Sequence, residues 1–260
     1  MKIVKIIAGI LVVASFASCT INEEIDLSSA GKGQYMLATD MSQALEMMKS
    51  MGGGQMPDSL KGKKIDTTMS LASQLDSLDK PLSAEEQAYF KNGTLHMVMS
   101  MDDNKFNMET KYPVKDIKDL QKFFKAYYYV DSVNKSKKKT PQPGEEAPEE
   151  GAPGAGMGGL ANVMGNMPST ASPYIITDTS IQRIALTKES MSETYGDQMK
   201  GAEMFMSQMV MSVTIKLPRP VKRLEGKSAK LLEDKKTVFF TASMAEMMED
   251  PENGSFLIVF

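Results

Sequence analysis

Methionine is the side chain in this sequence whose abundance first suggests chemistry. The chain has 24 methionines among 260 residues, and soft thioether sulfur selects Cu(I) over harder metal ions. Two segments space them closely, one with Met97, Met99 and Met101 and the other with Met204 and Met206. Flexible thioethers also fill irregular protein cores. The methionines are therefore open to two interpretations, a Cu(I) site or apolar core packing.

Histidine and cysteine are scarce. His96 is the only histidine and Cys19 is the only cysteine. A nucleophile with a histidine base would have to be built around His96, and a zinc site would need carboxylates almost entirely, which is disfavoured. The paired carboxylates fall in an expected turn and in a linker, where nothing shelters them for acid–base work. We therefore expect no catalytic residue, no enzyme activity and no bound cofactor.

The residues before Cys19 form a pattern in three parts. Lys2 and Lys5 supply positive charge, residues 6–17 are apolar or small, and small residues precede the cysteine. This is the organisation of a secretory signal, and the apolar run is shorter than the roughly 20 residues that span a membrane. The closing residues resemble the lipobox of bacterial lipoproteins: Phe16, Ala17, Ser18 and Cys19.

The resemblance to lipoproteins implies a location and a covalent modification. Cleavage would remove residues 1–18, and acyl chains on Cys19 would hold the mature chain on a membrane. Two or three acyl chains anchor a protein stably, whereas one binds a bilayer only marginally. Thr20 at the second mature position favours the outer membrane over the inner one. The alternative is an ordinary cleaved signal, which would leave a soluble mature chain.

Acidic residues follow the cysteine closely. Glu23, Glu24 and Asp26 are similar to the export signals that Bacteroidota place after the lipidated cysteine of surface lipoproteins. That resemblance implies display on the cell surface, and without it the domain would face the periplasm. The same segment could equally be the first strand, because Ile21 and Ile25 alternate with polar residues.

Charge and composition narrow the class of partner. The formal net charge is −3, and no basic patch could neutralise phosphates, so we expect no nucleic-acid partner. A methionine-lined interior would make an adaptable apolar pocket. We therefore expect a non-enzymatic binding or structural module for a protein or an apolar ligand, attached to the membrane through the lipid on Cys19. The alternative function is an envelope protein that binds Cu(I) through methionines.

Composition also divides the chain. Residues 1–18 resemble a signal, and residues 19–133 and 173–260 are two halves of folded sequence. Residues 134–172 are rich in Lys, Pro, Gly and Glu and are predicted to be a disordered insertion, because they cannot bury enough apolar area to offset the entropy of ordering. The apolar residues 256–260 predict a central strand. We expect the two halves to share one sheet, with two separate domains as the alternative.

Periodicity predicts the elements. Residues 95–101 and 106–112 alternate apolar and polar side chains, which predicts a hairpin whose two-residue turn pairs Met101 with Phe106. Apolar stripes predict helices over residues 41–51 and 65–75. Capping residues predict three more helices, which start after Ser83, after Asp116 (ending at about Val133) and after Ser243. Strands and helices do not alternate as in βαβ units. The sequence therefore predicts an α+β fold, a mainly antiparallel sheet with helices on one face and a long disordered internal insertion.

Overall fold

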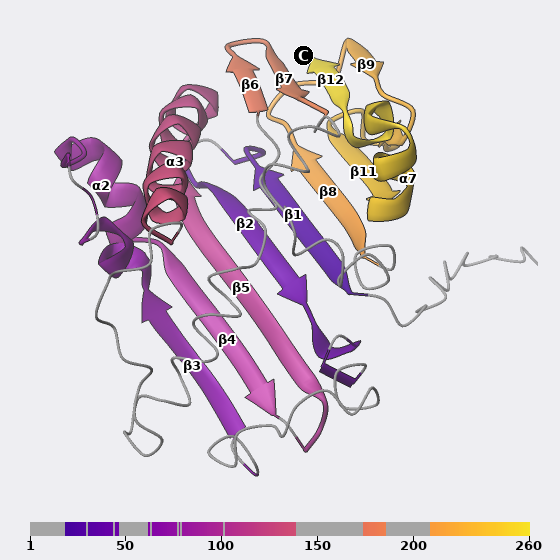
Figure 1. The fold of residues 1–260 in the computed structure, drawn as a ribbon. Helices are drawn as coiled ribbons and strands as arrows, with labels where there is room; N and C mark the ends of the chain where they lie inside the picture. Colours follow the sequence, from indigo (N-terminus) through magenta and orange to yellow (C-terminus); the bar gives the residue numbers. More distant parts are fainter. Residues whose placement is uncertain are drawn as a thin grey trace, which may run out of the picture.

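Strands from both halves of the chain build one large sheet in the computed structural model of the protein (Figure 1). The structure describes residues 19–29, 31–43, 45–46, 62, 64–76, 78, 80–100, 102–138, 174–185 and 209–260. The strands of the large sheet are β1 (Thr20–Asp26), β2 (Gly33–Asp40), β3 (Lys64–Ser70), β4 (Thr94–Ser100), β5 (Lys105–Val114), β8 (Val210–Lys216), β10 (Ala229–Leu231) and β11 (Thr237–Ser243). Their order is β10-β11-β8-β1-β2-β5-β4-β3. Neighbours are antiparallel, except that β1 and β8 run parallel.

A smaller sheet of four strands lies at one end of the large one (Figure 1). Its strands are β6 (Tyr174–Thr177), β7 (Ser180–Arg183), β9 (Arg223–Glu225) and β12 (Phe256–Val259), in the order β6-β7-β12-β9. The strand predicted at the end of the chain is confirmed as a central one, because β12 pairs with both β7 and β9. The halves of the chain meet in the large sheet through β1 and β8, not through β12.

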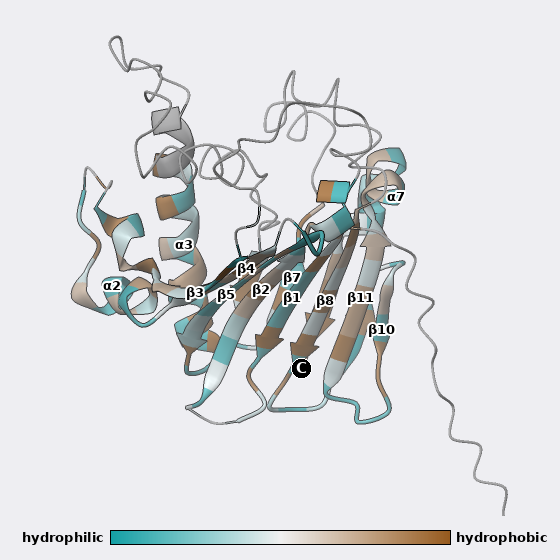
Figure 2. Cartoon of the chain, turned by 90° about the horizontal axis from the view of Figure 1, so that it is seen from below, coloured by the Kyte–Doolittle hydropathy of each residue, from teal (hydrophilic) through white to brown (hydrophobic). Residues whose placement is uncertain are grey.

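Helices cover one face of the large sheet, which we call the inner face. They are α2 (Ala84–Lys91), α3 (Ile117–Lys138) and α7 (Met244–Glu249), with the 3-10 helices η2 (Leu71–Leu75) and η4 (Pro251–Gly254). Figure 2 shows α2, α3 and α7 on the same side of the sheet. The α+β class, the mainly antiparallel sheet and the helices on one face are thus confirmed. α3 continues five residues past its predicted end at Val133.

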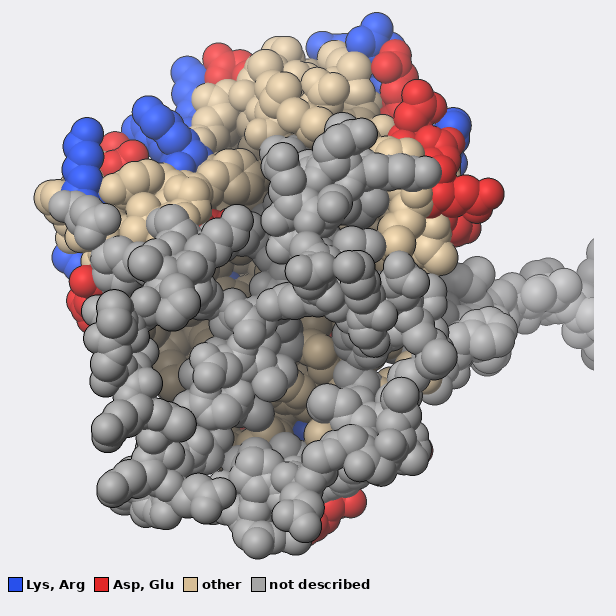
Figure 3. Space-filling model, in the orientation of Figure 1, with Lys and Arg blue, Asp and Glu red and all other residues tan. Residues whose placement is uncertain are grey.

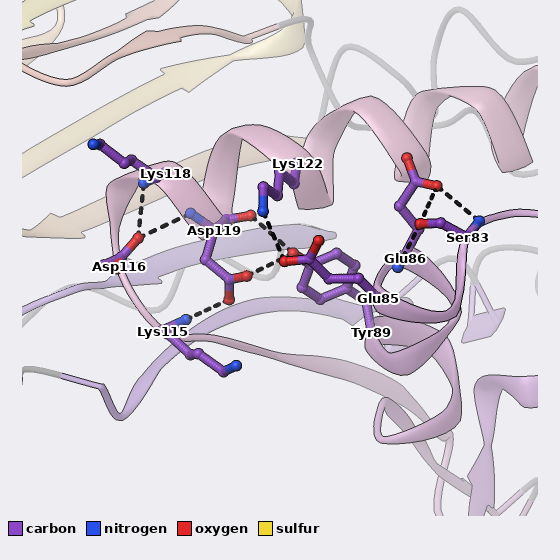
Figure 4. Close-up of polar contacts among 9 residues, drawn as sticks. All are labelled: Ser83, Glu85, Glu86, Tyr89, Lys115, Asp116, Lys118, Asp119 and Lys122. Atoms are coloured by element: carbon purple, nitrogen blue, oxygen red, sulfur yellow. Dashed lines mark hydrogen bonds and ion pairs between the residues drawn. The ribbon is translucent and has the colours of Figure 1, made fainter.

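Polar contacts at the helix starts fix the position of α3 (Figure 4). Ser83 and Glu86 form the predicted capping box of α2, and the carboxylate of Asp116 accepts two backbone N–H bonds in the first turn of α3. Asp119 joins the two helices, because its carboxylate accepts a hydrogen bond of 2.6 Å from the Tyr89 hydroxyl. Side-chain bonds at the N-terminus satisfy backbone donors that a helix leaves unpaired. Both predicted helix starts are confirmed.

Aromatic side chains fill the space between α3 and the sheet. Phe123 is fully buried, and its ring centre lies 4.8 Å from that of Tyr112, 5.2 Å from that of Tyr35 and 5.6 Å from that of Tyr89. Tilted and edge-on pairs at these separations stabilise a core beyond their area alone. Gly33 lets β2 start close to its neighbours, because a Cβ there would lie 2.5 Å from the Asp26 carbonyl oxygen.

The prediction of a helix over residues 65–75 is wrong in its first part. Residues 64–70 form the edge strand β3, and only residues 71–75 are helical, as η2. Thr67 and Thr68 are β-branched and favour extended backbone. Ile65, Thr67 and Met69 fall on one side of this strand, so the apolar spacing fits period two as well as period 3.6.

The hairpin between β4 and β5 is confirmed, but its predicted register is wrong. Met99 faces Phe106 and Ser100 faces Lys105, so residues 101–104 connect the strands. The Ser100 hydroxyl donates a 2.7 Å hydrogen bond to Asp103, and Asn104 takes a φ of 49°, which asparagine tolerates better than most residues. Side-chain bonding within the turn therefore favours a four-residue connection.

Several predicted segments lie wholly or partly outside the described residues. The helix after Asp40 begins as predicted, with the Ser42 amide donating to the Asp40 carboxylate at 2.9 Å, but its course beyond residue 46 is outside them. Residues 1–18 also lie outside the described residues, and so do residues 139–172 of the predicted insertion.

Acidic side chains lie close together on α7 and the turn that follows it. Figure 3 shows acidic groups at the upper right, where Figure 1 places α7. The acidic residues of α7 and the following turn are Glu246, Glu249, Asp250 and Glu252. Lys227 forms ion pairs with Asp250 and Glu252, so part of this negative charge is compensated.

Candidate functional site

Cys19 lies directly before the central strand β1. Its carbonyl accepts a hydrogen bond of 2.9 Å from the Val210 amide, and its side chain is 2% exposed. Continuing the strand registers by one residue places Met41 and Met209 on either side of Cys19. No linker therefore separates this cysteine from the sheet. The other lipobox-like residues, 16–18, lie outside the described residues.

The three acidic residues after Cys19 do not share one surface. Glu24 and Asp26 point to the outer face, where Lys216 Nζ lies 2.8 Å from Glu24 Oε1 and 3.6 Å from Asp26 Oδ2. Glu23 points to the inner face and is 2% exposed. The segment is the first strand, which was the alternative interpretation. Its role as an export signal stays a prediction.

Glu23 belongs to a buried polar cluster with Tyr35, Tyr174 and Arg183. The Tyr174 hydroxyl donates a 2.9 Å hydrogen bond to Glu23 Oε2. Glu23 Oε1, the Tyr35 hydroxyl and Arg183 Nε are buried without a hydrogen-bond partner among the described residues. Burial raises the pKa of the Glu23 carboxyl, and the positive charge of Arg183 opposes this shift.

Arg183 is buried on β7, close to β8 and β11. Its guanidinium donates to the Gly254 carbonyl, contacts the Met211 sulfur and lies 5.2 Å from the centre of the Phe240 ring. No carboxylate of the described residues lies within ion-pair distance of it, so it acts on Glu23 through its charge. Sequence reasoning missed this cluster, although Glu23 lies between Ile21 and Ile25 in the alternation of β1.

The methionines of β4 lie in the core. Met97 and Met99 are each 1% exposed and face Met108 and Phe106 across the hairpin. As predicted, His96 points to the other face, where its Nε2 lies 2.9 Å from the Asp66 carboxylate. Met101, Met204 and Met206 lie outside the described residues. Within the described ranges, no group of three or more His, Cys, Asp or Glu could hold a metal ion.

Replacing Met97 and Met99 together by leucine tests the two interpretations of the methionines. Core packing predicts a loss of less than about 1.5 kcal/mol per substitution, because methionine and leucine have similar volumes. Denaturant unfolding measures this, and competition with a chromogenic Cu(I) chelator measures copper binding. Packing also predicts an unchanged competition curve, whereas a weaker affinity for Cu(I) in the variant would favour the copper site.

A half-enclosed pocket of about 150 Å³ opens on the inner face between α3 and the sheet. Its lining comes from six elements: Leu37, Leu71, Gln74, Phe90, Leu95, Thr110, Tyr112, Tyr127, Val130 and Asp131. A second hollow of about 330 Å³ crosses the outer face and is lined mainly by polar side chains. The inner pocket is the better site for an apolar ligand, because most of its lining is aliphatic or aromatic.

Comparison of the chain with protein-family models, with curated proteins and with solved structures found no match. Among the described residues, no helix is long and apolar enough to cross a membrane. The function must therefore be argued from the chain's own residues.

Proposed function

We propose that this protein is a lipid-anchored protein of the bacterial outer membrane whose domain is a non-enzymatic binding module. The signal-like residues 1–18 and the resemblance of residues 16–19 to a lipobox support the anchor. That resemblance carries the proposal, and β1 begins at the residue after Cys19. Acyl chains on Cys19 would hold this end of the sheet against the bilayer with no intervening linker.

Acylation requires the buried Cys19 sulfur to leave the core. Cleavage would make Cys19 the first residue of the mature chain, so turning its side chain outward would require no movement of a preceding residue. The hydrogen bond from the Val210 amide to the Cys19 carbonyl need not break, since it involves only the backbone. The fold of β1 is therefore compatible with an acylated residue at this end.

The inner face supports a binding role for the anchored domain. Its pocket lies between strands and a helix that come from different parts of the chain, an arrangement common in ligand sites. An apolar ligand fits this lining better than a protein surface does, because the pocket is concave and half-enclosed. The expected ligand class is therefore apolar.

The anchor is tested by replacing Cys19 with serine. We expect wild-type protein in envelopes to carry two or three acyl chains on an N-terminal Cys19 and to resist a carbonate wash. The variant should lack acyl chains and be uncleaved or soluble. Intact mass spectrometry and fractionation measure both properties, with Thr20→Ser as the matched control that keeps the anchor. A wild-type mass without acyl chains, or a variant that remains membrane-bound after the wash, would contradict the proposal.

A further inference from the structure

The hollow on the outer face of the large sheet has the size of a small-ligand site. Its volume of about 330 Å³ falls at the lower end of the roughly 300–1,000 Å³ seen in ligand pockets. The strand registers place Ala38 between Asn22 on β1 and Glu109 on β5. Because the methyl group of Ala38 is shorter than these two neighbours, the sheet surface is hollowed there. The hollow can therefore hold a compact molecule such as a single ring.

The charges of the hollow favour a neutral ligand. The ten described residues that line it include the carboxylates of Asp40 and Glu109 and no Lys or Arg, so an anion would bring its charge beside Asp40. Lys111 Nζ lies 2.6 Å from Glu109 Oε1 and compensates that carboxylate. Asp40 is exposed, and water and salt screen exposed charges. A cation therefore gains little here as well.

Hydrogen bonds hold the polar groups of the hollow in place. Asp40 Oδ1 accepts a bond of 2.9 Å from the Ser42 amide. The Asn107 side-chain amide, oriented so that its donors and acceptors are satisfied, donates to the same oxygen at 2.9 Å. A carboxylate has about four acceptor sites, so Asp40 Oδ2 can accept from a ligand hydroxyl while these bonds persist. Across the hollow, the Asn22 amide can both donate and accept.

The floor of the hollow is less polar than its sides. Ala38 and Val98 both line it, and Val98 faces Asn107 across the β4–β5 hairpin. A sugar ring has C–H groups on its faces and hydroxyls around its edge. Its hydroxyls both donate and accept hydrogen bonds, as the amides and carboxylates at the sides of the hollow require.

We infer that the outer-face hollow binds a neutral sugar unit, with a C–H face of the ring over Ala38 and Val98. Asp40 accepts hydrogen bonds from ring hydroxyls, and the Asn22 amide bonds hydroxyls on the opposite side. This site goes beyond the proposed function, since the inner-face pocket lies on the other side of the sheet. Asp40 supplies the preference against an anion.

Sugars that differ only in charge test the inference. Full-length protein in a sugar-free detergent is titrated with the methyl glycosides of glucose, galactose and mannose, and binding is measured by saturation-transfer NMR. At least one glycoside should bind saturably. The same sugar with a carboxylate at C6 should bind at least about tenfold more weakly, and the sugar with an amine at C6 at most about twofold more tightly.

Two variants place the sugar in the hollow. Asp40→Asn should weaken binding of the neutral sugar at least about fivefold and should keep the fold, because asparagine also caps the helix that follows. Ala38→Phe should fill the hollow and abolish binding. Two matched controls lie outside the lining, the exposed carboxylate change Asp178→Asn and the outer-face substitution Thr214→Phe. Both should leave the affinity unchanged.

Several outcomes would overturn the inference. They are no saturable binding of any of the three glycosides, a C6 carboxylate that binds as tightly as the neutral sugar, and a C6 amine that binds more than about twofold more tightly. Unchanged sugar affinity in Asp40→Asn would also overturn it, and this variant decides the matter if Ala38→Phe fails to fold. Acylation and membrane retention are measured in the same preparations. If they are normal, failure concerns the sugar site and not the anchor.

Discussion

Replacing Arg183 with methionine should lower the free energy of unfolding by about 1–3 kcal/mol, the range seen when a buried polar group loses its hydrogen-bond partner. Methionine keeps an apolar stem of similar length, so the lost guanidinium charge accounts for most of the effect. Glu23 would then remain buried with only the Tyr174 hydroxyl as donor. The Gly254 carbonyl, which accepts from Arg183, would also lose its partner. Denaturant unfolding at pH 7 measures the change.

A double variant separates the charge from the packing. Glu23→Gln is close in shape to glutamate and still offers an oxygen to the Tyr174 hydroxyl, but it carries no charge. Arg183→Met with Glu23→Gln should therefore recover more than half of the stability lost in Arg183→Met alone. The coupling of the two substitutions is read from a double-mutant cycle. A double variant no more stable than the single one would show that packing, not charge, explains the loss.

Glu23 and Arg183 also predict how the free energy of unfolding depends on pH. Burial raises the pKa of Glu23 in the folded state above its ordinary value of 4.5. The stability that this group contributes is therefore fully present below the ordinary pKa and is lost as the pH rises through the raised value. Removing Arg183 removes the charge that opposes the rise, so the cost of Arg183→Met should be smaller at pH 4 than at pH 7. A cost that grows on acidification would contradict this assignment.

The sequence predicts correctly those helices and strands that are determined by neighbouring residues. The capping box at Ser83 and the cap at Asp116 needed only the next turn of helix, and the alternation in residues 95–101 needed only the strand itself. The register of the β4–β5 hairpin depended on bonding between Ser100 and Asp103, which periodicity cannot show. The edge strand β3 was missed because its apolar residues fit either period.

Long-range partners account for what the sequence left unpredicted. The parallel pairing of β1 with β8 joins residues about 190 positions apart in the chain. Glu23 was interpreted as part of an exposed acidic segment, and only the fold brings Tyr174 and Arg183 to it. The pocket likewise takes its lining from residues that are far apart in the sequence, from Leu37 on β2 to Asp131 on α3. Burial of Met97 and Met99 was foreseeable, because the hairpin alternation already placed them on the core side.

Truncating Phe123 to alanine should destabilise the fold by about 3–5 kcal/mol, the range for a fully buried phenylalanine. The side chain lies where α3 meets β2, β5 and α2, and its ring contacts Tyr35, Tyr112 and Tyr89. A cavity there would remove contacts on three sides at once. Chemical unfolding measures the loss, and Phe123→Leu should lose clearly less because it fills more of the space.

The Phe123 variant also links the core to the pocket. α3 supplies Tyr127, Val130 and Asp131 to the pocket lining, so loosening the helix should weaken binding of a small apolar ligand even in the folded fraction. Lys122→Ala is the matched control, since Lys122 is exposed and its ion pair with Glu85 is at the surface; such pairs contribute little. If Phe123→Ala unfolds no more easily than Lys122→Ala, α3 is not held by this aromatic core. If it is less stable but binds the apolar ligand normally, the pocket does not depend on how tightly α3 is held.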